Sequence, residues 1–253
     1  MKTKAAILTE LNTPLAVEEI ELPPLEYGQV LVRIQRSGIC GAQIGEIAGV
    51  KGPDRFLPHL MGHEAGGVVV ETGPGVSQVK VDDHVCLHWR KGAGIQARPA
   101  QYQWGARTVN SGWVTTFSEY TVVSENRVTP VGKAIPFEIA ALMGCAVTTG
   151  LGLINNDARV KIGQSVAVLG AGGVGLNVVQ GAAMVSAYPI IAIDLYDHKL
   201  ELARQFGATH TINSAQVDLA SALLEITGPC GVDVFVENTG QVRLIETAYK
   251  LTA

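Results

Sequence analysis

The sequence predicts an α/β protein with two domains, a β-rich N-terminal domain followed by a partial, doubly wound parallel sheet. Strand and turn signals dominate up to about residue 150. From about residue 160, short apolar strands alternate with helical segments, which is the pattern of a parallel sheet. A glycine-rich run, Gly170–Gly175, joins the first of those strands to the first helix. We therefore place the domains at residues 1–154 and 155–253.

The strands of the first domain are identified by apolar runs between turn residues. Ala5–Leu8, Val30–Gln35 and Gly66–Glu71 are rich in β-branched and other apolar side chains, which favour a pleated, half-buried strand. Proline and glycine punctuate the chain at Leu22–Pro24 and Thr72–Gly75. These signals predict several short strands joined by tight turns.

The second domain is predicted as repeated strand–helix units. We expect strands at residues 165–169, 189–193, 210–212 and 233–237, and helices at 172–185, 197–206 and 216–226. Gly207 ends the second helix. Such units form a parallel sheet with right-handed crossovers. Because a doubly wound domain needs two βαβαβ halves, we expect roughly 100 further residues beyond Ala253 and regard the sequence as truncated at its C-terminus.

Composition limits the classes of function. Hydrophobic residues make up 47% of the chain and charged residues 17%, which is enough for a sizeable core. A net charge of −4 gives no whole-chain bias toward nucleic acid or a membrane surface. No apolar run approaches the length of a membrane span, and the N-terminus lacks the apolar core of a signal peptide, so we expect a cytoplasmic protein. The four cysteines are widely spaced, so a disulfide framework is not expected.

The run Gly170-Ala-Gly-Gly-Val-Gly175 has the G-x-G-x-x-G pattern of a dinucleotide-binding loop. It follows a predicted strand and opens a predicted helix, which are the contexts that the pattern requires. Gly170 would permit the tight turn, Gly172 would let the backbone approach a pyrophosphate, and Gly175 would let the helix pack on the strand.

The helix that begins after this turn supplies the rest of the predicted nucleotide site. Its first residues, Gly173 and Val174, would turn backbone N–H groups and the positive end of the helix dipole toward the phosphates. Asp194 ends the next strand and would accept hydrogen bonds from the adenosine ribose, which favours NAD over NADP. The alternative is an ordinary strand–helix turn with a surface aspartate.

Five segments carry a resemblance to a known family. They are Ser37–Gly41, Gly62–Gly66, Asp83–Val85, Gly144–Gly150 and Lys161–Gly170. In this order, and near this spacing, they resemble the zinc-dependent medium-chain alcohol dehydrogenases over residues 1–253. The resemblance implies a GroES-like catalytic domain followed by a Rossmann domain that binds NAD.

The resemblance also implies one catalytic zinc, held by Cys40, His63 and Cys145, with Glu64 as the acidic neighbour on the metal. Zinc prefers sulfur and nitrogen ligands, and a catalytic site keeps a fourth position open for water or substrate. Bound zinc lowers the pKa of water from about 15.7 to near 7 and can act similarly on an alcohol. The alternative is that these are ordinary buried side chains, and a full-length protein without zinc would favour it.

Two threonines are further candidates for the nucleotide site. Thr149 lies in the segment that, by the resemblance, packs beside the nicotinamide, and Thr239 follows the strand that ends at Glu237. For Thr239, a plain strand-to-helix turn is an equal alternative.

The residues after Cys40 depart from the family pattern. Ala42 replaces the hydroxyl residue that usually begins the proton relay, and Gly45 removes a histidine that ends it in some members. Gln43 stands where an acidic residue is usual, and its amide oxygen could accept an N–H from His63. Protons would leave through water, a substrate group, or a residue such as His59 or His88. Weak activity on simple alcohols follows as a hypothesis, which rapid turnover of ethanol would contradict.

The segment that often holds a second, structural zinc on four cysteines contains only Cys86, so no structural zinc is expected. It carries Arg90, Lys91, Arg98 and Arg107 among aromatic residues. One interpretation is a solvated loop anchored by aromatic side chains. The other is a basic cleft or oligomer contact, which would favour a substrate that bears a phosphate or carboxylate.

The sequence therefore predicts an oxidoreductase that moves hydride between NAD and an alcohol, polyol or sugar-like substrate, with zinc as the Lewis acid. We expect a homo-oligomer, a dimer or tetramer, without nucleic-acid or membrane partners. Two alternatives remain open: an NAD-binding relative that is weakly active or inactive and has a scaffold or regulatory role, and a zinc-free reductase of enones or quinones.

Overall fold

The computed structural model describes residues 1–253, and the chain divides into two compact units, Met1–Cys145 and Ala146–Ala253. Residues that we assigned to the end of the first domain belong to the second unit. Helix α3 (Ala146–Gly152) packs on the helix that follows the glycine-rich run, and Ile154 is buried in the core of the second unit. The division therefore falls earlier in the chain than the expected boundary at residue 154.

The first unit contains a closed five-stranded barrel and a five-stranded sheet. In barrel order the strands are β1 (Lys2–Leu8), β2 (Ala16–Glu21), β7 (Gln101–Trp104), β8 (Arg107–Asn110) and β4 (His59–Leu60). The sheet has the order β10 (Val128–Pro130), β6 (His84–His88), β5 (Glu64–Thr72), β3 (Gln29–Ser37) and β9 (Tyr120–Ser124). The expected strands at 5–8, 30–35 and 66–71 are present as parts of β1, β3 and β5.

The barrel strands follow the alternation that a half-buried strand requires. In β1, Thr3, Ala5 and Ile7 are buried, whereas Lys2 and Lys4 are exposed. The unit also has three short helices: α1 (Gly41–Ile47) between β3 and β4, the 3₁₀ turn η1 (Glu125–Arg127) between β9 and β10, and α2 (Phe137–Met143) after β10. None of the three was predicted, since each is too short for a helical period to emerge from the sequence.

The second unit is a four-stranded parallel sheet with the order β13-β12-β11-β14. Its strands are β11 (Val166–Leu169), β12 (Ile190–Asp194), β13 (His210–Asn213) and β14 (Val234–Glu237). Its helices are α3, the π-helical turn η2 (Leu153–Asp157), α4 (Gly173–Met184), α5 (Asp197–Gln205), α6 (Leu219–Thr227) and α7 (Val242–Lys250). The order is the first part of a doubly wound sheet, so the predicted fold class is confirmed.

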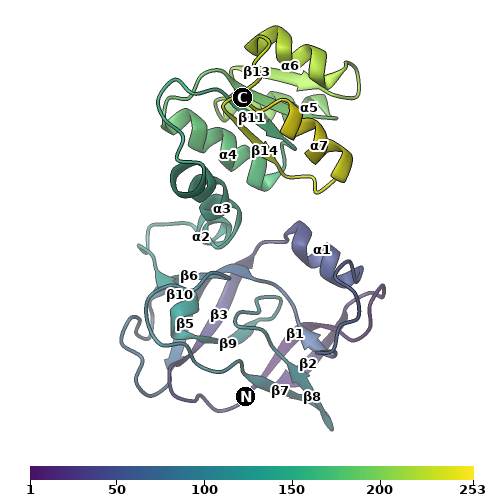
Figure 1. Ribbon diagram of the computed structural model, residues 1–253. Helices are drawn as coiled ribbons and strands as arrows, with labels where there is room; N and C mark the ends of the chain where they lie inside the picture. Colours follow the sequence, from purple (N-terminus) through teal and green to yellow (C-terminus); the bar gives the residue numbers. More distant parts are fainter. The chain divides into compact units, whose positions relative to one another are not determined.

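Helices cover both faces of this sheet (Figure 1). Val166 and Val168 of β11 pack with Val178 of α4 on one face. On the other face, Leu169 packs with Leu223 of α6. Because both faces of the strands are buried, they are continuously apolar rather than alternating.

One predicted helix begins later than expected. We placed its start at residue 216, but α6 begins at Leu219 because Asp218 is its N-cap and accepts a hydrogen bond from the Ser221 backbone N–H at 2.9 Å. The predicted stop after the preceding helix is confirmed, since Gly207 follows α5 with a φ of +111°.

No single helix of the chain is long and apolar enough to cross a membrane. Two short helical segments joined by a bend, Phe137–Met143 and Ala146–Asp157, are together long and apolar enough by length and composition alone.

Candidate functional site

Three predicted ligands come together in the first unit from distant parts of the chain. Cys40 precedes α1, His63 precedes β5, and Cys145 closes the unit after α2. Their ligand atoms, two sulfurs and one imidazole nitrogen, all lie within 4.8 Å of one another. One imidazole and two thiols are the donor types that zinc prefers, so the group could hold a zinc ion with a further position open.

The backbone before His63 explains how its ring reaches this place. Gly62 has a φ of +91°, and a Cβ there would lie 2.3 Å from Thr116 Oγ1. Only glycine fits this turn at the start of β5. The ring is partly buried, and burial lowers the pKa of His63, which favours the neutral imidazole that binds metal. Its Nε2 is buried without a hydrogen-bond partner, the situation that a metal ion would relieve.

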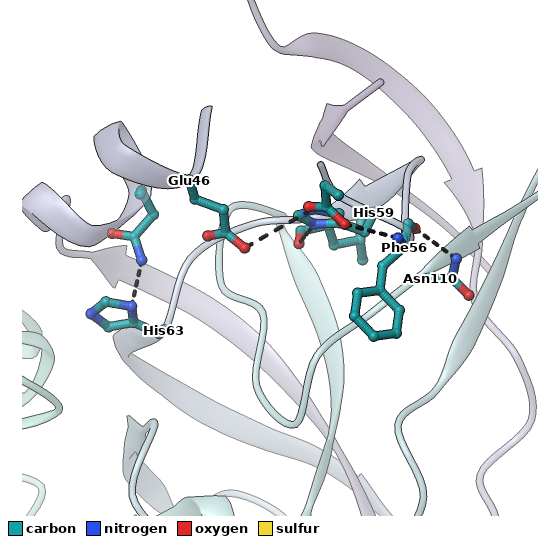
Figure 2. Close-up of polar contacts among 8 residues, drawn as sticks. Glu46, Phe56, His59, His63 and Asn110 are labelled. Atoms are coloured by element: carbon teal, nitrogen blue, oxygen red, sulfur yellow. Dashed lines mark hydrogen bonds and ion pairs between the residues drawn. The ribbon is translucent and has the colours of Figure 1, made fainter. Parts of the chain in front are cut away.

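Gln43 of α1 lies between two of these residues. Its side chain is buried, and its Oε1 accepts the Cys40 backbone N–H at 2.9 Å. Its Nε2 contacts Nδ1 of His63, a contact that Figure 2 marks with a dashed line. We expected the amide oxygen to face His63. In the structure it faces the backbone, because the first N–H groups of a short helix need an acceptor.

Glu64, the first residue of β5, is buried beside the group but is not among its clustered ligand atoms. Glycines at two positions make room for it: a Cβ at Gly38 would lie 2.3 Å from Glu64 Oε1, and one at Gly144 would lie 2.8 Å from Glu64 Cβ. Its role as the acidic neighbour of the metal stays a prediction.

The glycine-rich loop of the second unit has the predicted local geometry. Gly170 has a φ of +95°, which the tight turn after β11 requires. A Cβ at Gly175 would lie 1.8 Å from the Gly170 carbonyl oxygen, so α4 can pack against the turn only with glycine there. At Gly172, the N-cap of α4, a Cβ would meet no atom within 4 Å, which leaves the backbone open to a ligand. Gly173 and Val174 are the first residues of α4.

Asp194 ends β12 next to this loop. Its Oδ2 accepts the Ala171 backbone N–H at 2.8 Å, and its Oδ1 accepts those of Leu195 at 2.8 Å and Tyr196 at 3.2 Å. The carboxylate therefore holds the glycine-rich loop against the end of β12, a role that the sequence did not indicate. Lys199 Nζ lies 3.7 Å from Oδ2 and partly offsets the charge.

The two threonine candidates differ in their surroundings. Thr239 is exposed and lies beside the loop: a Cβ at Gly170 would be 3.3 Å from its methyl group. Its backbone N–H donates to Glu237 Oε1 at 2.6 Å, as expected of a strand-to-helix turn. Thr149 is a half-buried residue of α3. The contacts that we expect Thr149 and Thr239 to make with a nicotinamide therefore stay predictions.

Comparison with known proteins identifies the family. The family model of the alcohol dehydrogenase GroES-like domain matches residues 26–133, and that of zinc-binding dehydrogenases matches residues 173–253. An S-(hydroxymethyl)glutathione dehydrogenase from Synechocystis sp. is 38% identical over 98% of this chain and 74% of its own length. An alcohol dehydrogenase class-3 from Cereibacter sphaeroides is 34% identical over the same shares.

The chain belongs to the zinc-dependent medium-chain alcohol dehydrogenase family. A solved structure described as an alcohol dehydrogenase zinc-binding domain protein from Burkholderia ambifaria matches with a TM-score of 0.90 and 29% identity, over 100% of this chain and 75% of that one. The family uses Zn²⁺ and NAD, and the chain is accordingly an NAD-dependent oxidoreductase. The predicted family, class of enzyme and cofactors are confirmed.

The two histidines that we considered for a proton route in this dehydrogenase are both engaged elsewhere. His59 Nδ1 donates to the Leu60 carbonyl at 2.9 Å, and its Nε2 lies 2.9 Å from Asp54 Oδ2 and 4.0 Å from Glu46 Oε1 (Figure 2). His59, Asp54 and Glu46 form a group of their own that could hold a cation, separate from the cysteine group.

His88 is fixed through both ring nitrogens. Nδ1 donates to the Arg90 carbonyl at 2.7 Å, and Nε2 lies 2.9 Å from Thr129 Oγ1. Burial, the largest influence, lowers its pKa. These contacts tie the segment after β6 to β10, so His88 has a structural explanation.

The segment after β6 carries exposed basic side chains, which a solvated loop and a basic cleft or oligomer contact would both show, so each interpretation stays a prediction. Arg90 and Arg107 are exposed and lie over the rings of Trp89 and Trp104, with 5.5 and 5.9 Å from guanidinium carbon to ring centre. Cys86 is buried in the core, as expected, and burial together with the charge of Glu64 raises its pKa to about 12.

Two buried charged residues that the sequence did not single out hold this loop. Arg127 donates to the carbonyl of Trp89 and, at 3.1 Å, to Gln96 Oε1. Glu125 is fully buried and binds three backbone N–H groups. In the sequence they look like part of an ordinary polar turn, and no local signal marks their burial.

Proposed function

We propose that the chain catalyses the reversible oxidation of an alcohol to an aldehyde or ketone, with zinc on Cys40, His63 and Cys145 and with NAD as hydride acceptor. The observation that carries this proposal is the cluster of two thiols and one imidazole within 4.8 Å. A zinc ion held there would supply Lewis acidity, which lowers the pKa of an alcohol hydroxyl and polarises a carbonyl.

The chain's own residues would divide the remaining tasks. Cys40 and Cys145 would bind as thiolates and His63 through the unpartnered Nε2, with Glu64 as their acidic neighbour. The loop from Gly170 to Gly175, with Thr149 and Thr239, would hold and orient the dinucleotide.

The substrate class rests on the relatives. Two of them, 38% and 37% identical, are named S-(hydroxymethyl)glutathione dehydrogenase. We therefore propose a hydroxymethyl adduct of a thiol as the first substrate to test, with polyols and sugar-like alcohols as the second class. Since Ala42 carries no hydroxyl, we expect simple alcohols such as ethanol to turn over slowly.

The test is NADH formation by the zinc-loaded protein with S-(hydroxymethyl)glutathione, a polyol and ethanol, followed by absorbance. We expect oxidation of at least one of the first two, and loss of that activity when a chelator removes zinc. Protein that holds zinc and NAD yet oxidises none of them would favour the inactive relative. Zinc-independent reduction of a quinone or enone would favour the other alternative.

Asp194 is proposed to set the preference for NAD. A 2′-phosphate would meet its carboxylate, and like-charge contacts at a binding site are unfavourable. We expect NADH to bind tighter than NADPH by about tenfold or more, which corresponds to about 1.4 kcal/mol. Fluorescence titration of both cofactors measures this difference. In Asp194→Asn the preference should shrink, whereas equal affinities in the unaltered protein would remove the role given to Asp194.

A further inference from the structure

The side-chain amide of Gln43 serves two neighbours with opposite ends. Oε1 accepts the Cys40 N–H at 2.9 Å, and Nε2 faces His63 Nδ1. A backbone N–H can only donate, so the end that faces Cys40 must be the oxygen. The end left for His63 is therefore the NH₂ group, which can only donate, and Nδ1 must accept from it.

This arrangement decides where His63 carries its proton. If Nδ1 accepts a hydrogen bond, the proton of the neutral ring lies on Nε2. Yet Nε2 is the nitrogen turned away from Gln43, buried and without a partner, and so the one left for a metal. A protonated nitrogen has no lone pair for zinc. The hydrogen bonds thus favour the tautomer that does not bind metal.

We propose that Gln43 is a positioning residue that weakens zinc binding. Zinc binding at His63 would compete with the hydrogen bond that Gln43 Oε1 accepts from the Cys40 N–H at the start of α1. For zinc to bind Nε2, the proton must move to Nδ1, and Nδ1–H then needs an acceptor. If the amide turns its oxygen toward His63, its NH₂ group faces the Cys40 N–H, and the hydrogen bond between the Gln43 side chain and the start of α1 is lost. A carboxylate has an oxygen at each end and would accept from both donors at once.

The inference rests on the proposed zinc site, and the decisive variant is Gln43→Glu. We expect it to bind zinc about 10–100-fold tighter than the unaltered protein. This is the range by which residues that hydrogen-bond to metal ligands change metal affinity. Competition with a chromogenic chelator measures both dissociation constants. The control is Gln101→Glu, which adds the same charge at an exposed position of β7 and should leave zinc affinity unchanged.

Tighter zinc binding by Gln43→Glu could also result from attraction between the metal and the added charge. A second measurement, on the His63 tautomer, separates the two explanations. Long-range ¹H–¹⁵N NMR of the zinc-free, unaltered protein should show the His63 proton on Nε2, and on Nδ1 once zinc is bound. The Cys40 amide should then exchange with deuterium faster in the zinc-loaded protein than in the zinc-free one.

The outcomes are distinguishable. Equal zinc affinity in Gln43→Glu and the unaltered protein, or a zinc-free His63 with its proton on Nδ1, would overturn the inference. If Gln43→Glu does not fold, the two measurements on the unaltered protein decide alone. Failure of the unaltered protein to bind zinc at all would defeat the proposed function instead, while the tautomer in zinc-free protein would still be decided by NMR.

Discussion

Replacing Cys40 by serine is expected to abolish zinc binding at micromolar metal and, with it, alcohol oxidation. A serine hydroxyl stays protonated at neutral pH and is a poor zinc ligand, whereas a cysteine thiolate is a preferred one. Replacing a residue that hydrogen-bonds to a metal ligand lowers metal affinity by about 10–100-fold. Replacing the ligand Cys40 itself should lower zinc affinity by more than that. Zinc content after dialysis measures it, and cobalt-substituted protein should lose part of its sulfur-to-metal absorption band.

The matched control is Cys230→Ser. Cys230 is exposed in the second unit and is not among the clustered ligand atoms, so the same chemical change there should leave zinc content unaltered. Cys40→Ser should still bind NADH, because Gly170–Gly175 and Asp194 all lie in the second unit. One equivalent of zinc retained by the Cys40 variant would show that the metal is held elsewhere, with the His59 group as the next place to look.

The clustering of Cys40, His63 and Cys145 could be predicted from sequence through the family resemblance, because the signal of the matching segments lies in residue types and their order. Cysteine and histidine are chemically distinctive, and Cys40, His63 and Cys145 each stand beside glycines in the sequence. Gly62, with its φ of +91° and its close approach to Thr116, is one that the backbone requires. The glycines of the nucleotide loop are informative for the same reason, since Gly175 admits no Cβ.

The orientation of Gln43 could not be predicted, because it depends on competition between two donors. From sequence, the amide oxygen could equally face His63 or the backbone at Cys40. The outcome is decided by α1, a helix of seven residues whose N-terminal N–H groups need an acceptor. A helix that short leaves no periodic signal, so neither its presence nor its hydrogen bonds were foreseen.

The burial of Glu125 was equally hidden, and its replacement is expected to have the largest effect on the stability of the first unit. The carboxylate is fully buried in the 3₁₀ turn η1, where Oε1 accepts the backbone N–H groups of Ser77 at 2.6 Å and Gln78 at 2.8 Å. Oε2 accepts that of Ile95 at 2.7 Å. One side chain thus joins the turn to two other segments of the chain through three backbone N–H groups.

Glu125→Ala should lower the free energy of unfolding by about 3 kcal/mol or more, because each buried N–H left without a partner costs about 1–3 kcal/mol. Urea unfolding followed by tryptophan fluorescence reports on the first unit, which contains Trp89, Trp104 and Trp113. Glu18→Ala, at an exposed position of β2, is the matched control and should change little. A Glu125 variant as stable as this control would contradict the role of the buried carboxylate.

The same contact predicts how stability depends on pH. Burial raises the pKa of Glu125, but the hydrogen bonds from Ser77, Gln78 and Ile95 outweigh it and hold the pKa below its ordinary value. A pKa that is lower in the folded state means that the carboxylate stabilises the fold above the unfolded pKa, near about 4.3. That contribution is lost as the pH falls through the folded value. The stability difference between the unaltered protein and Glu125→Gln should therefore be largest at neutral pH and shrink on acidification. A difference that stays constant from neutral to acidic pH would mean that the charge of Glu125 contributes nothing, and that its shape alone holds the segments together.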